Sequence, residues 1–313
     1  MLRKILKWVG IVLGGLIGLI VLALVVVLAY GQMSFHKKVD RPVYAITADT
    51  SPEGVARGEY LVRDVIGCVG CHGPLVAEGQ APDPNAPLAG HSEPVTFGPL
   101  SGNFAPPNLT PDKETGLGSW TDAEIARAIR EGLNKDGVAL SIMPAYEFHS
   151  LSDADVAAIV GYLRSLEPVR NEVPDVTFNL PGKAMFALGI LSPLNPTAPI
   201  TDPVPAPAPG TAEAGKYIVS ITGCVRCHGE SLAGGPYQFQ EAGTPPAANL
   251  TPAGELVGWS EADFVTALTT GQKPDGRTLD ETMPWKEYGR MKEEDLKAIF
   301  AYLKTLPKAE SKK

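Results

Sequence analysis

The sequence predicts an all-α fold in which two copies of a small helical domain follow an N-terminal transmembrane helix. Three observations support this prediction. An unbroken apolar run covers Trp8 to Tyr30, a set of short motifs occurs twice along the 313-residue chain, and the segments around those motifs begin with helix-capping residues. The chain shows no sustained alternation of apolar and polar residues, the pattern that is typical of half-buried strands.

The first predicted element is a membrane helix within residues 1–31. Trp8 to Tyr30 are 23 consecutive uncharged residues, enough to cross a hydrocarbon core of about 30 Å at about 1.5 Å per residue. Arg3, Lys4 and Lys7 precede this run, so the positive-inside tendency keeps the N-terminus in the cytoplasm and exports the rest. The length of the run favours a retained anchor. The alternative is a cleavable signal peptide, for which Ala29-Tyr30-Gly31 offers a small-x-small site.

The charge balance bears on possible partners. The chain has 35 Asp and Glu residues against 27 Lys and Arg, a formal net charge of −8, and three of the cations precede the membrane helix. The exported part is therefore still more acidic, which argues against a nucleic-acid partner. An acidic surface can steer a basic redox partner, or it can simply keep an exported protein soluble.

Two pentapeptides carry the chemistry of the chain. Residues 68–72, Cys-Val-Gly-Cys-His, recur as Cys-Val-Arg-Cys-His at 224–228, and together they use all four cysteines. On one helical turn, cysteines at i and i+3 and a histidine at i+4 share a face. The thiols can then form thioethers with the two vinyl groups of a haem while the imidazole binds the iron. The sequence therefore predicts two covalently bound haem c groups, held by Cys68, Cys71 and His72 and by Cys224, Cys227 and His228.

Three simpler interpretations of the cysteines fit less well. A four-cysteine zinc site needs its two pairs roughly 15 to 20 residues apart, whereas 152 residues separate Cys71 from Cys224. A thioredoxin-like pair opens a helix in a βαβ unit, and neither motif has a strand-rich flank. A structural disulfide would not require the histidine, which occurs in both motifs. Haem attachment is the interpretation that accounts for both cysteines and the histidine of each pentapeptide.

The repeat extends beyond the pentapeptides and defines two domains, residues 52–168 and 211–307. Each copy has about 100 to 115 residues, an ordinary size for a single domain. Residues 56–62 match residues 213–219 upstream of the cysteines. Downstream, Asn-Leu-Thr-Pro, a tryptophan, Met-Pro and Tyr-Leu recur in the same order, beginning at Asn108, Trp120, Met143 and Tyr162 in the first copy and at Asn249, Trp259, Met283 and Tyr302 in the second.

Helix-start signals occur at equivalent places in the two copies. Ser51 before Pro52 predicts an N-cap followed by proline in the first turn. Residues 121–124, Thr-Asp-Ala-Glu, and 260–263, Ser-Glu-Ala-Asp, have the form of capping boxes before apolar residues at helical spacing. Ser152 is expected to cap the last helix of the first copy. Proline-rich and glycine-rich loops join the helices, so the core of each copy would be thin without a large apolar prosthetic group.

The remaining segments contain no copy of the repeat. They are a juxtamembrane segment over 32–51, a linker over 169–210 and a charged tail over 308–313. Within the linker, residues 203–209 alternate proline with valine or alanine and predict a semi-rigid polyproline II spacer. The apolar run from Ala184 to Leu191 is too short to span a bilayer. We expect it to pack against a domain or to lie at the membrane surface, with a docking face for a partner as a third option.

With these motifs the chain resembles class I cytochrome c domains, in particular the tandem-haem cytochrome subunits of membrane-bound alcohol and gluconate dehydrogenases. The similarity covers both copies, and it also touches the linker at residues 178–181, Phe-Asn-Leu-Pro. The family subunits carry three haems and lack this N-terminal anchor arrangement. The resemblance therefore implies the cofactor chemistry and leaves the partner proteins open.

The resemblance implies that Met143 and Met283 are the second axial ligands of the two irons. They are the only two of the six methionines that occupy matched positions in the repeat. Methionine opposite histidine closes the coordination sphere and raises the reduction potential, which suits electron transfer. Bis-histidine ligation of the first haem by His91 or His149 is the alternative.

Two further details concern the haem surroundings. The resemblance implies that a backbone carbonyl near Pro106 or Pro107 orients His72, while the second copy has Ala247 and Ala248 at this place and the detail is not extended to it. Trp120 and Trp259 either hydrogen-bond haem propionates or pack in the core.

The function expected from the sequence is electron relay by a membrane-anchored dihaem cytochrome c on the periplasmic side of a bacterial inner membrane. Electrons would pass singly from a quinol-oxidising complex or a periplasmic dehydrogenase to a terminal oxidase or a soluble carrier, within a larger respiratory or dehydrogenase complex. All four axial ligands are consumed, so we expect no catalytic residue and no small-molecule substrate. The alternative is a dihaem enzyme of the peroxidase or thiosulfate dehydrogenase type, in which one iron opens or takes an unusual ligand; the thiosulfate version lacks a free cysteine.

Overall fold

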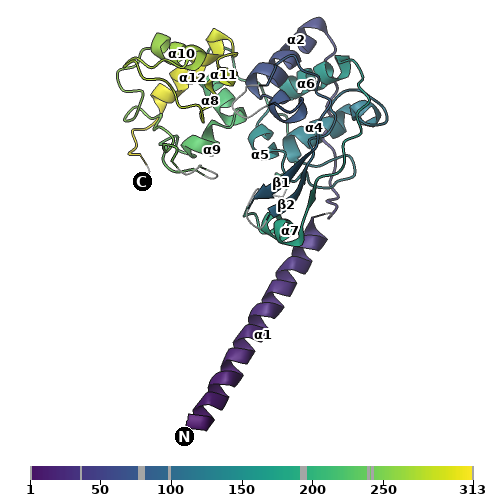
Figure 1. Cartoon of the computed structure of the whole chain (residues 1–313). Coiled ribbons are helices and arrows are strands. Elements are labelled where there is room, and N and C mark those ends of the chain that lie inside the picture. Colours follow the sequence, from purple (N-terminus) through teal and green to yellow (C-terminus); the bar gives the residue numbers. More distant parts are fainter. Residues whose placement is uncertain are drawn as a thin grey trace.

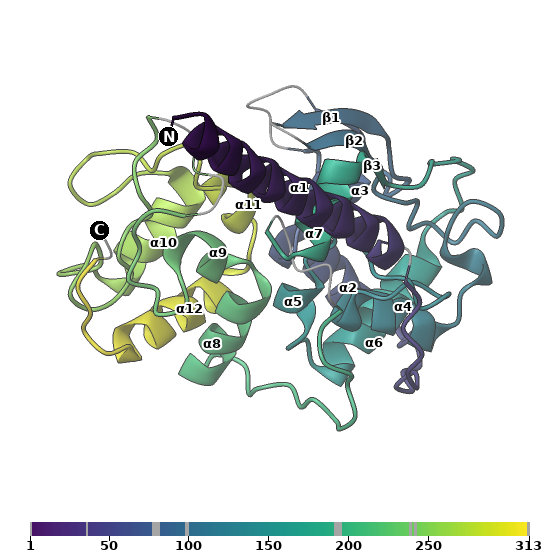
Figure 2. The same cartoon turned by 90° about the horizontal axis from the view of Figure 1, so that it is seen from below.

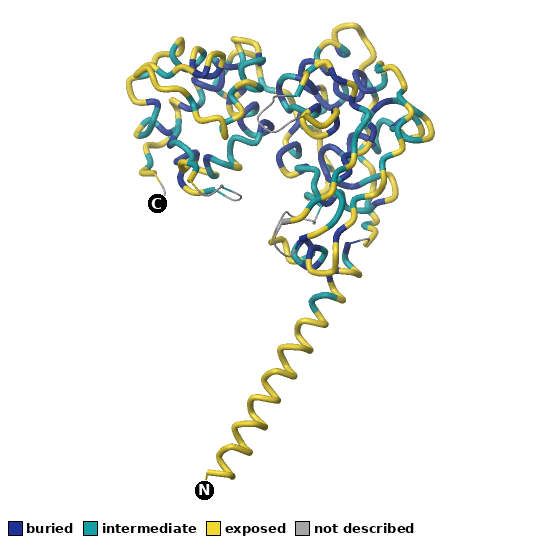
Figure 3. Tube along the Cα trace, viewed as in Figure 1, coloured by how far each residue is buried: buried dark blue, intermediate teal, exposed yellow. Residues whose placement is uncertain are grey.

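The computed structural model describes residues 2–35, 37–76, 82–97, 100–190, 196–237, 240 and 243–311. Its first element is α1 (Leu2–Ser34), a single long helix that projects away from the rest of the molecule (Figure 1). Its apolar side chains are exposed along most of its length (Figure 3). By length and composition α1 could cross a membrane, which fits either a membrane anchor or a signal sequence.

Beyond α1 the described chain forms two helical lobes that lie side by side in both views (Figures 1 and 2). The first lobe holds most of the elements before residue 170 and the second holds those after residue 211. Leu191, at the end of the apolar linker run, and the last two residues of the predicted tail lie outside the described residues.

The first lobe is built from short helices whose predicted starts are confirmed. The Ser51 hydroxyl accepts a hydrogen bond from the Gly54 N–H, Thr121 forms a capping box with Glu124, and Ser152 caps the last helix. Each cap satisfies a backbone donor that the first helical turn leaves unpaired. The helical elements are α2 (Pro52–Tyr60), the π-helical η1 (Leu61–Val65), α3 (Val69–His72), η2 (Leu117–Ser119), α4 (Asp122–Glu131), α5 (Ala145–Phe148) and α6 (Asp153–Ser165).

The second lobe repeats this series in a shorter form. Ser260 forms the predicted capping box with Asp263, and Thr211 caps the first helix of the lobe. Its helices are α8 (Ala212–Ile221), α9 (Cys224–His228), α10 (Glu261–Thr270), α11 (Trp285–Tyr288) and α12 (Glu293–Thr305).

In each lobe the first and last helices cross at a glycine. A Cβ atom on Gly58 of α2 would lie 2.0 Å from the Ala158 carbonyl oxygen of α6, and one on Gly215 of α8 would lie 1.9 Å from the Ala298 oxygen of α12. Only a residue without a side chain allows the two backbones to approach this closely. The matched glycines therefore fix the helix pair against which the haem-attachment motif of each lobe is placed.

A small antiparallel sheet departs from the all-α prediction, although the described chain is mainly helical. Strands β1 (Glu93–Phe97), β2 (Leu100–Phe104) and β3 (Thr177–Phe178) pair in the order β1-β2-β3. The hairpin lies in the longer loop of the first copy, so the repeat gave no signal for it. Its third strand comes from the linker, and Gly102 lets that strand approach, because a Cβ there would lie 1.8 Å from the Thr177 oxygen.

The apolar part of the linker packs beside the end of α1. Helix α7 (Leu180–Ala187) contacts α1 so closely that a Cβ on Gly31 would lie 2.6 Å from the Ala184 Cα. The Lys183 ammonium donates to the Gln32 side-chain oxygen at 2.9 Å. A separate apolar cluster joins the residue after α1 to β2, β3 and α7; its members are Phe35, Leu100, Phe178 and Phe186. Ala184 and Phe186 thus pack against the first lobe, the first of the three predicted placements, whereas Leu188 and Ile190 later in the run are 52% and 53% exposed.

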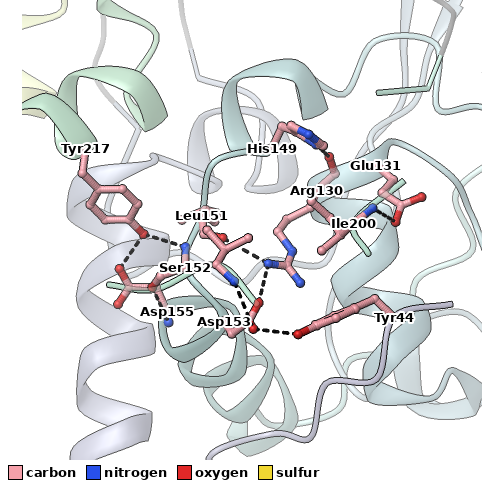
Figure 4. Close-up of polar contacts among 11 residues, drawn as sticks. Tyr44, Arg130, Glu131, His149, Leu151, Ser152, Asp153, Asp155, Ile200 and Tyr217 are labelled. Atoms are coloured by element: carbon pink, nitrogen blue, oxygen red, sulfur yellow. Dashed lines mark hydrogen bonds and ion pairs between the residues drawn. The ribbon is translucent and has the colours of Figure 1, made fainter. Parts of the chain in front are cut away.

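The two lobes meet through a half-buried tyrosine of the second lobe. The Tyr217 hydroxyl of α8 donates to the Asp155 carboxylate at 2.7 Å and accepts from the Ser152 N–H at 3.1 Å (Figure 4). Both partners lie at the start of α6. Tyr217 therefore caps the last helix of the first lobe from outside, and burial raises the pKa of its phenol, which keeps it a donor.

The equivalent tyrosine of the first lobe makes the reciprocal contact. The Tyr60 hydroxyl donates to the Asp295 carboxylate at 2.6 Å and accepts from the Lys292 N–H at 3.0 Å, both at the start of α12. Tyr60 matches Tyr217 in the repeat, and the start of α12 matches the start of α6. Reciprocal contacts of this kind are the property of an interface with two-fold symmetry. The two copies therefore associate as two subunits of a symmetric dimer would.

A third pair of contacts follows the same rule. The Arg290 guanidinium donates to the Arg63 carbonyl oxygen at 3.2 Å, and at the matching place the Ser150 and Ser220 hydroxyls are 2.9 Å apart. The contacting residues differ between the two directions, but they occupy matching positions in the repeat. The relative placement of the lobes is thus built into the repeated elements.

The second half of the linker is bound along the first lobe. Arg130, a buried residue of α4, donates to the Asp153 carboxylate at 2.7 Å and to the Leu151 carbonyl oxygen (Figure 4). The same aspartate accepts from the Tyr44 hydroxyl at 3.0 Å, and its N–H donates to the Val204 carbonyl oxygen at 2.9 Å. The Arg130–Asp153 pair therefore joins α4, α6, the juxtamembrane segment and the proline-rich spacer.

Replacement of Arg130 by methionine is expected to lower the free energy of unfolding by about 2–3 kcal/mol. The change leaves Asp153 without its cation, and the cost falls below that of breaking a fully buried pair because the Asp153 side chain is 27% exposed. Urea denaturation followed by circular dichroism measures the effect. The control is Arg170→Met, which breaks an exposed pair with Glu114 and should cost at most about 0.5 kcal/mol. Equal losses in the two variants would contradict the structural role of Arg130.

Candidate haem-attachment sites

The histidines of the two pentapeptides are held in the same way. His72 ends α3 and His228 ends α9, and both are buried. The Nδ1 atom of His72 lies 2.8 Å from the Pro107 carbonyl oxygen, and that of His228 lies 2.7 Å from the Ala248 carbonyl oxygen. A carbonyl oxygen can only accept, so Nδ1 carries the proton in each ring. The Nε2 lone pair of each histidine is then free of its own proton and available to a metal.

Burial keeps both imidazoles neutral. It lowers the pKa of His72 to about 4, against the opposing effect of the hydrogen bond to Pro107. It also lowers the pKa of His228. An imidazole must be neutral to bind iron, so both rings are in the ligating form at neutral pH.

The Asn-Leu-Thr-Pro motif positions the carbonyl group that accepts the hydrogen bond from each histidine. In the first copy, the Asn108 side-chain oxygen accepts from the Thr110 N–H at 2.9 Å, and its amide donates to the Val169 carbonyl oxygen at 2.7 Å. Asn249 makes the same two bonds, with the Thr251 N–H and the Ala309 carbonyl oxygen. The asparagine turns the chain and fastens it to the segment that follows the last helix.

A glycine allows that carbonyl to come close to the histidine. Gly90 and Gly234 both have positive φ, and their N–H groups donate to the His72 and His228 carbonyl oxygens at 2.8 and 2.9 Å. A Cβ on Gly90 would lie 2.4 Å from the Pro106 oxygen. The corresponding Cβ on Gly234 would lie 2.3 Å from the Ala247 oxygen. The loop with the glycine thus binds the histidine backbone, and the loop with the carbonyl binds the histidine ring.

The cysteines lie on the same short helices as the histidines. Cys68 is the N-cap of α3, and Cys224 is the first residue of α9. None of the four forms a disulfide, and burial raises the pKa of Cys68 to about 12. Burial also raises the pKa of Cys224. The helical spacing puts each pair on the face of its histidine, as two thioethers to one haem require.

The two methionines occupy identical turns. Pro144 has φ −79° and ψ 54°, and Pro284 has φ −77° and ψ 55°. In each turn the residue after the proline donates its N–H to the methionine carbonyl oxygen, at 2.8 Å for Met143 and 2.7 Å for Met283. These are inverse γ-turns, which the fixed φ of proline favours. Both methionine side chains are half-buried and pack against the apolar core.

The second lobe contains a cavity of about 580 Å³ between its histidine and its methionine. This volume is in the range of cofactor pockets. Cavity-lining residues that bear on haem binding include Cys224, Cys227, His228, Trp259, Met283 and Met291. The donor set, the size and the largely apolar lining therefore fit a haem attached through the two cysteines.

Other predicted site residues lie at the periphery. Trp259 lines the cavity, and both Trp120 and Trp259 pack against the core, which leaves their role toward propionates a prediction. His91 donates its backbone N–H to the Pro106 oxygen, and thus lies on the Nδ1 side of His72. The Nδ1 atom of His149 is 3.1 Å from the Arg130 carbonyl oxygen.

Sequence reasoning missed two sets of residues at these sites. The first is the glycine pair Gly90 and Gly234, whose signal was a glycine 18 residues after the first histidine and 6 after the second. The loop lengths differ, so the match could not be seen without the structure. The second is the pair Arg226 and Glu147, which joins the two lobes at 2.8 Å. Arg226 is matched by Gly70 in the first copy, so the repeat could not indicate the pair although Glu147 is matched by Glu287.

The fold and the sites define a class: a protein of tandem helical domains, each with a Cys-x-x-Cys-His motif and a methionine turn, built to hold covalent haem. Comparison with known proteins agrees. The cytochrome c family profile matches residues 55–167 and 212–307. The chain belongs to the cytochrome c family, whose domains carry covalently bound haem c.

Characterised relatives include subunits of dehydrogenases. The chain is 29% identical over 283 residues to the cytochrome c subunit of the quinone alcohol dehydrogenase of Gluconobacter oxydans, across 81% of this chain and 55% of that subunit. It is 29% identical to the gluconate 2-dehydrogenase cytochrome c subunit of Pantoea cypripedii, across 80% of this chain and 59% of that subunit. A dihaem cytochrome c-type protein of Cereibacter sphaeroides is also 29% identical, with 78% of this chain and 83% of that protein covered. The chain thus spans little more than half of the two dehydrogenase subunits.

Replacement of Gly234 by alanine is expected to destabilise the second lobe by more than its backbone conformation alone explains. The matched control is Gly276→Ala, because Gly276 also has positive φ but has open space around its Cβ position. The control should cost about 1–2 kcal/mol from the left-handed conformation. Gly234→Ala should cost about 1–3 kcal/mol more, because the loop that carries the Ala248 carbonyl must move. Urea denaturation of both variants measures the difference, and equal costs would show that the close approach is dispensable.

Proposed function

We propose that this chain is a membrane-anchored dihaem cytochrome c that relays single electrons on the periplasmic side of a bacterial inner membrane. The observation that carries the proposal is the paired geometry of the two copies: a buried neutral histidine bonded to a backbone carbonyl, and a methionine held in a proline turn. A haem bound between such residues supplies a one-electron couple. Two equivalent sites in one chain suit a relay.

In the proposed arrangement, Cys68 and Cys71 hold one haem and Cys224 and Cys227 hold the other. His72 and His228 are the proximal ligands, each oriented by its carbonyl, and a histidine that donates to a carbonyl is a stronger ligand. Met143 and Met283 are the second axial ligands. All ligand positions are then occupied by protein groups, which leaves no position for a substrate and distinguishes a carrier from a peroxidase.

The proposal that α1 is a retained anchor is supported by its packing. Its last turn contacts α7 at Gly31 and Gln32, so helix and folded domain are continuous. Arg3, Lys4 and Lys7 at its start favour a cytoplasmic N-terminus. This orientation puts both haem sites outside the cytoplasm, in the compartment of the proposed redox partners.

The proposed partners follow from the relatives. Two relatives that match about four fifths of this chain are named as the cytochrome c subunits of a quinone alcohol dehydrogenase and of a gluconate 2-dehydrogenase. We infer that this chain also works with other redox proteins, accepting electrons from a quinol-oxidising complex or a periplasmic dehydrogenase. A terminal oxidase or soluble carrier would accept them. The acidic surface, at a net charge of −8, would favour basic partners.

Replacement of Met283 by leucine is expected to remove the methionine-to-iron charge-transfer absorption of one ferric haem and to lower its reduction potential, because methionine ligation raises the potential. The control is Met291→Leu, since Met291 lines the same cavity and is buried in the core. That variant should keep the absorption. Visible spectroscopy and a redox titration measure both. A high-spin ferric haem or peroxide turnover in the unchanged protein would favour the enzyme alternative.

The anchor proposal predicts that the full chain stays in the membrane fraction after high-salt and carbonate washes. Its intact mass should include the residues before Trp8. Replacement of Leu19 and Ile20 by arginine should release a large fraction, because charge at the centre of a membrane helix costs several kcal/mol in total. A soluble product whose mass begins at or after Tyr30 would show that the segment is a cleaved signal peptide.

A further inference from the structure

We propose that Arg226 and Glu147 form a positioning pair that holds the haem-attachment motif of the second lobe against the methionine loop of the first and defines where electrons cross between the lobes. The inference rests on the proposed function. In the crossing step, one electron leaves a reduced site, which is oxidised, and enters the oxidised site of the other lobe, which is reduced. No proton and no further reactant take part.

The contact joins the working parts of the two sites. Arg226 lies between the two cysteines of the second motif, on α9. Glu147 lies on α5, directly after the turn that contains Met143 and Pro144. The Arg226 Nε and Nη2 atoms donate to the two carboxylate oxygens of Glu147, each at 2.8 Å. The haem-attachment helix of the second lobe is thereby fixed to the methionine loop of the first.

The Glu147 carboxylate is buried, and the backbone at Gly223 lies close to it. The Glu147 side chain is 4% exposed, against 51% for that of Arg226. A Cβ on Gly223, the residue before Cys224, would lie 3.0 Å from a Glu147 oxygen. A buried carboxylate is costly without a partner, and a two-fold hydrogen-bonded arginine is the partner best suited to it. The pair therefore has a carboxylate shielded from water and a guanidinium that keeps contact with solvent.

The charges of the pair lie beside both attachment sites. Arg226 directly precedes Cys227, and Gly223, the residue before Cys224, closely approaches the Glu147 carboxylate. Glu147 itself is on the short helix that follows Met143 and Pro144. The pair therefore lies between the attachment motif of the second lobe and the methionine loop of the first.

The link breaks the reciprocity of the rest of the junction. The tyrosine and aspartate contacts occur twice, once in each direction. The residue that matches Arg226 in the first motif is Gly70, which has no side chain to offer to Glu287, the match of Glu147. Gly70 and Glu287, the matching residues, cannot form such a pair, so the folding of a lobe does not require one. Arg290 and Asp64 form another charged contact across the junction, at 3.3 Å. The Arg226–Glu147 pair differs from it because it joins the haem-attachment helix of one lobe to the methionine loop of the other. This placement indicates a role in communication between the two redox sites.

The test uses the full-length holoprotein with Glu147→Gln and Arg226→Gln. Loss of the carboxylate should raise the reduction potential of the second haem, and loss of the guanidinium should lower that of the first, because nearby negative charge favours the oxidised iron and positive charge the reduced iron. Both changes should slow electron transfer between the haems. Redox titration and flash photolysis measure the two effects.

Loss of one partner of a buried charge pair should also increase the fraction of molecules with separated lobes by about tenfold or more. The exchanged variant, Glu147→Arg with Arg226→Glu, should restore much of the transfer rate while reversing the shifts in potential. Arg226→Lys keeps the positive charge but loses the pair of parallel hydrogen bonds to Glu147. It serves as a milder variant if the others fold poorly. It should slow transfer with little change in potential.

The control is Lys286→Gln, which breaks an exposed pair with Glu281 outside the junction and should leave the transfer rate unchanged. If both single variants keep the transfer rate and both potentials, the pair has no positioning role and the inference is wrong, even when methionine ligation is intact. If the unchanged protein lacks low-spin, methionine-ligated haems, the proposed function itself fails.

Discussion

The hydrogen bond from a histidine ring to a backbone carbonyl is the constraint around which each lobe is arranged. His72 and His228 end short helices, and the carbonyl that receives each Nδ1 proton comes from a distant loop. An asparagine turn shapes that loop, and a glycine with positive φ gives it room. Because the acceptor is a main-chain oxygen, Pro107 and Ala248 serve equally well. The differing side chains at this place therefore change nothing in the geometry of the bond.

Duplication of this unit also explains how the two lobes meet. Tyr60 and Tyr217 each bind the start of the last helix of the opposite lobe, as matching residues do across a two-fold axis. The proline-rich spacer is bound to the first lobe through Asp153. The distance between the two sites is then set by packed, reciprocal contacts. The length of the linker has little influence on it, because the spacer does not hold the lobes together.

The sequence predicted the parts of the fold that depend on local chemistry. Helix caps, the Cys-x-x-Cys-His motifs and the repeat can be read from neighbouring residues, and the structure has the predicted caps at Ser51, Thr121, Ser152 and Ser260. The sheet was missed because β3 comes from the linker, some 75 residues after β2. The carbonyl contact of His228 was not predicted because the expectation was tied to proline, whereas the interaction needs only a main-chain oxygen.

The junction shows why a repeat reveals similarity more readily than contact. The tyrosines at 60 and 217 are visible as matched residues, and nothing in their spacing indicates that each would bind the other copy. Arg226 and Glu147 are hidden for the opposite reason, since each is matched by a residue that forms no such pair. Reciprocal contacts hold two similar domains together without distinguishing them. The Arg226–Glu147 contact has no reciprocal counterpart, so it adds to the differences between the two redox sites, and a relay that passes electrons in one direction needs such differences.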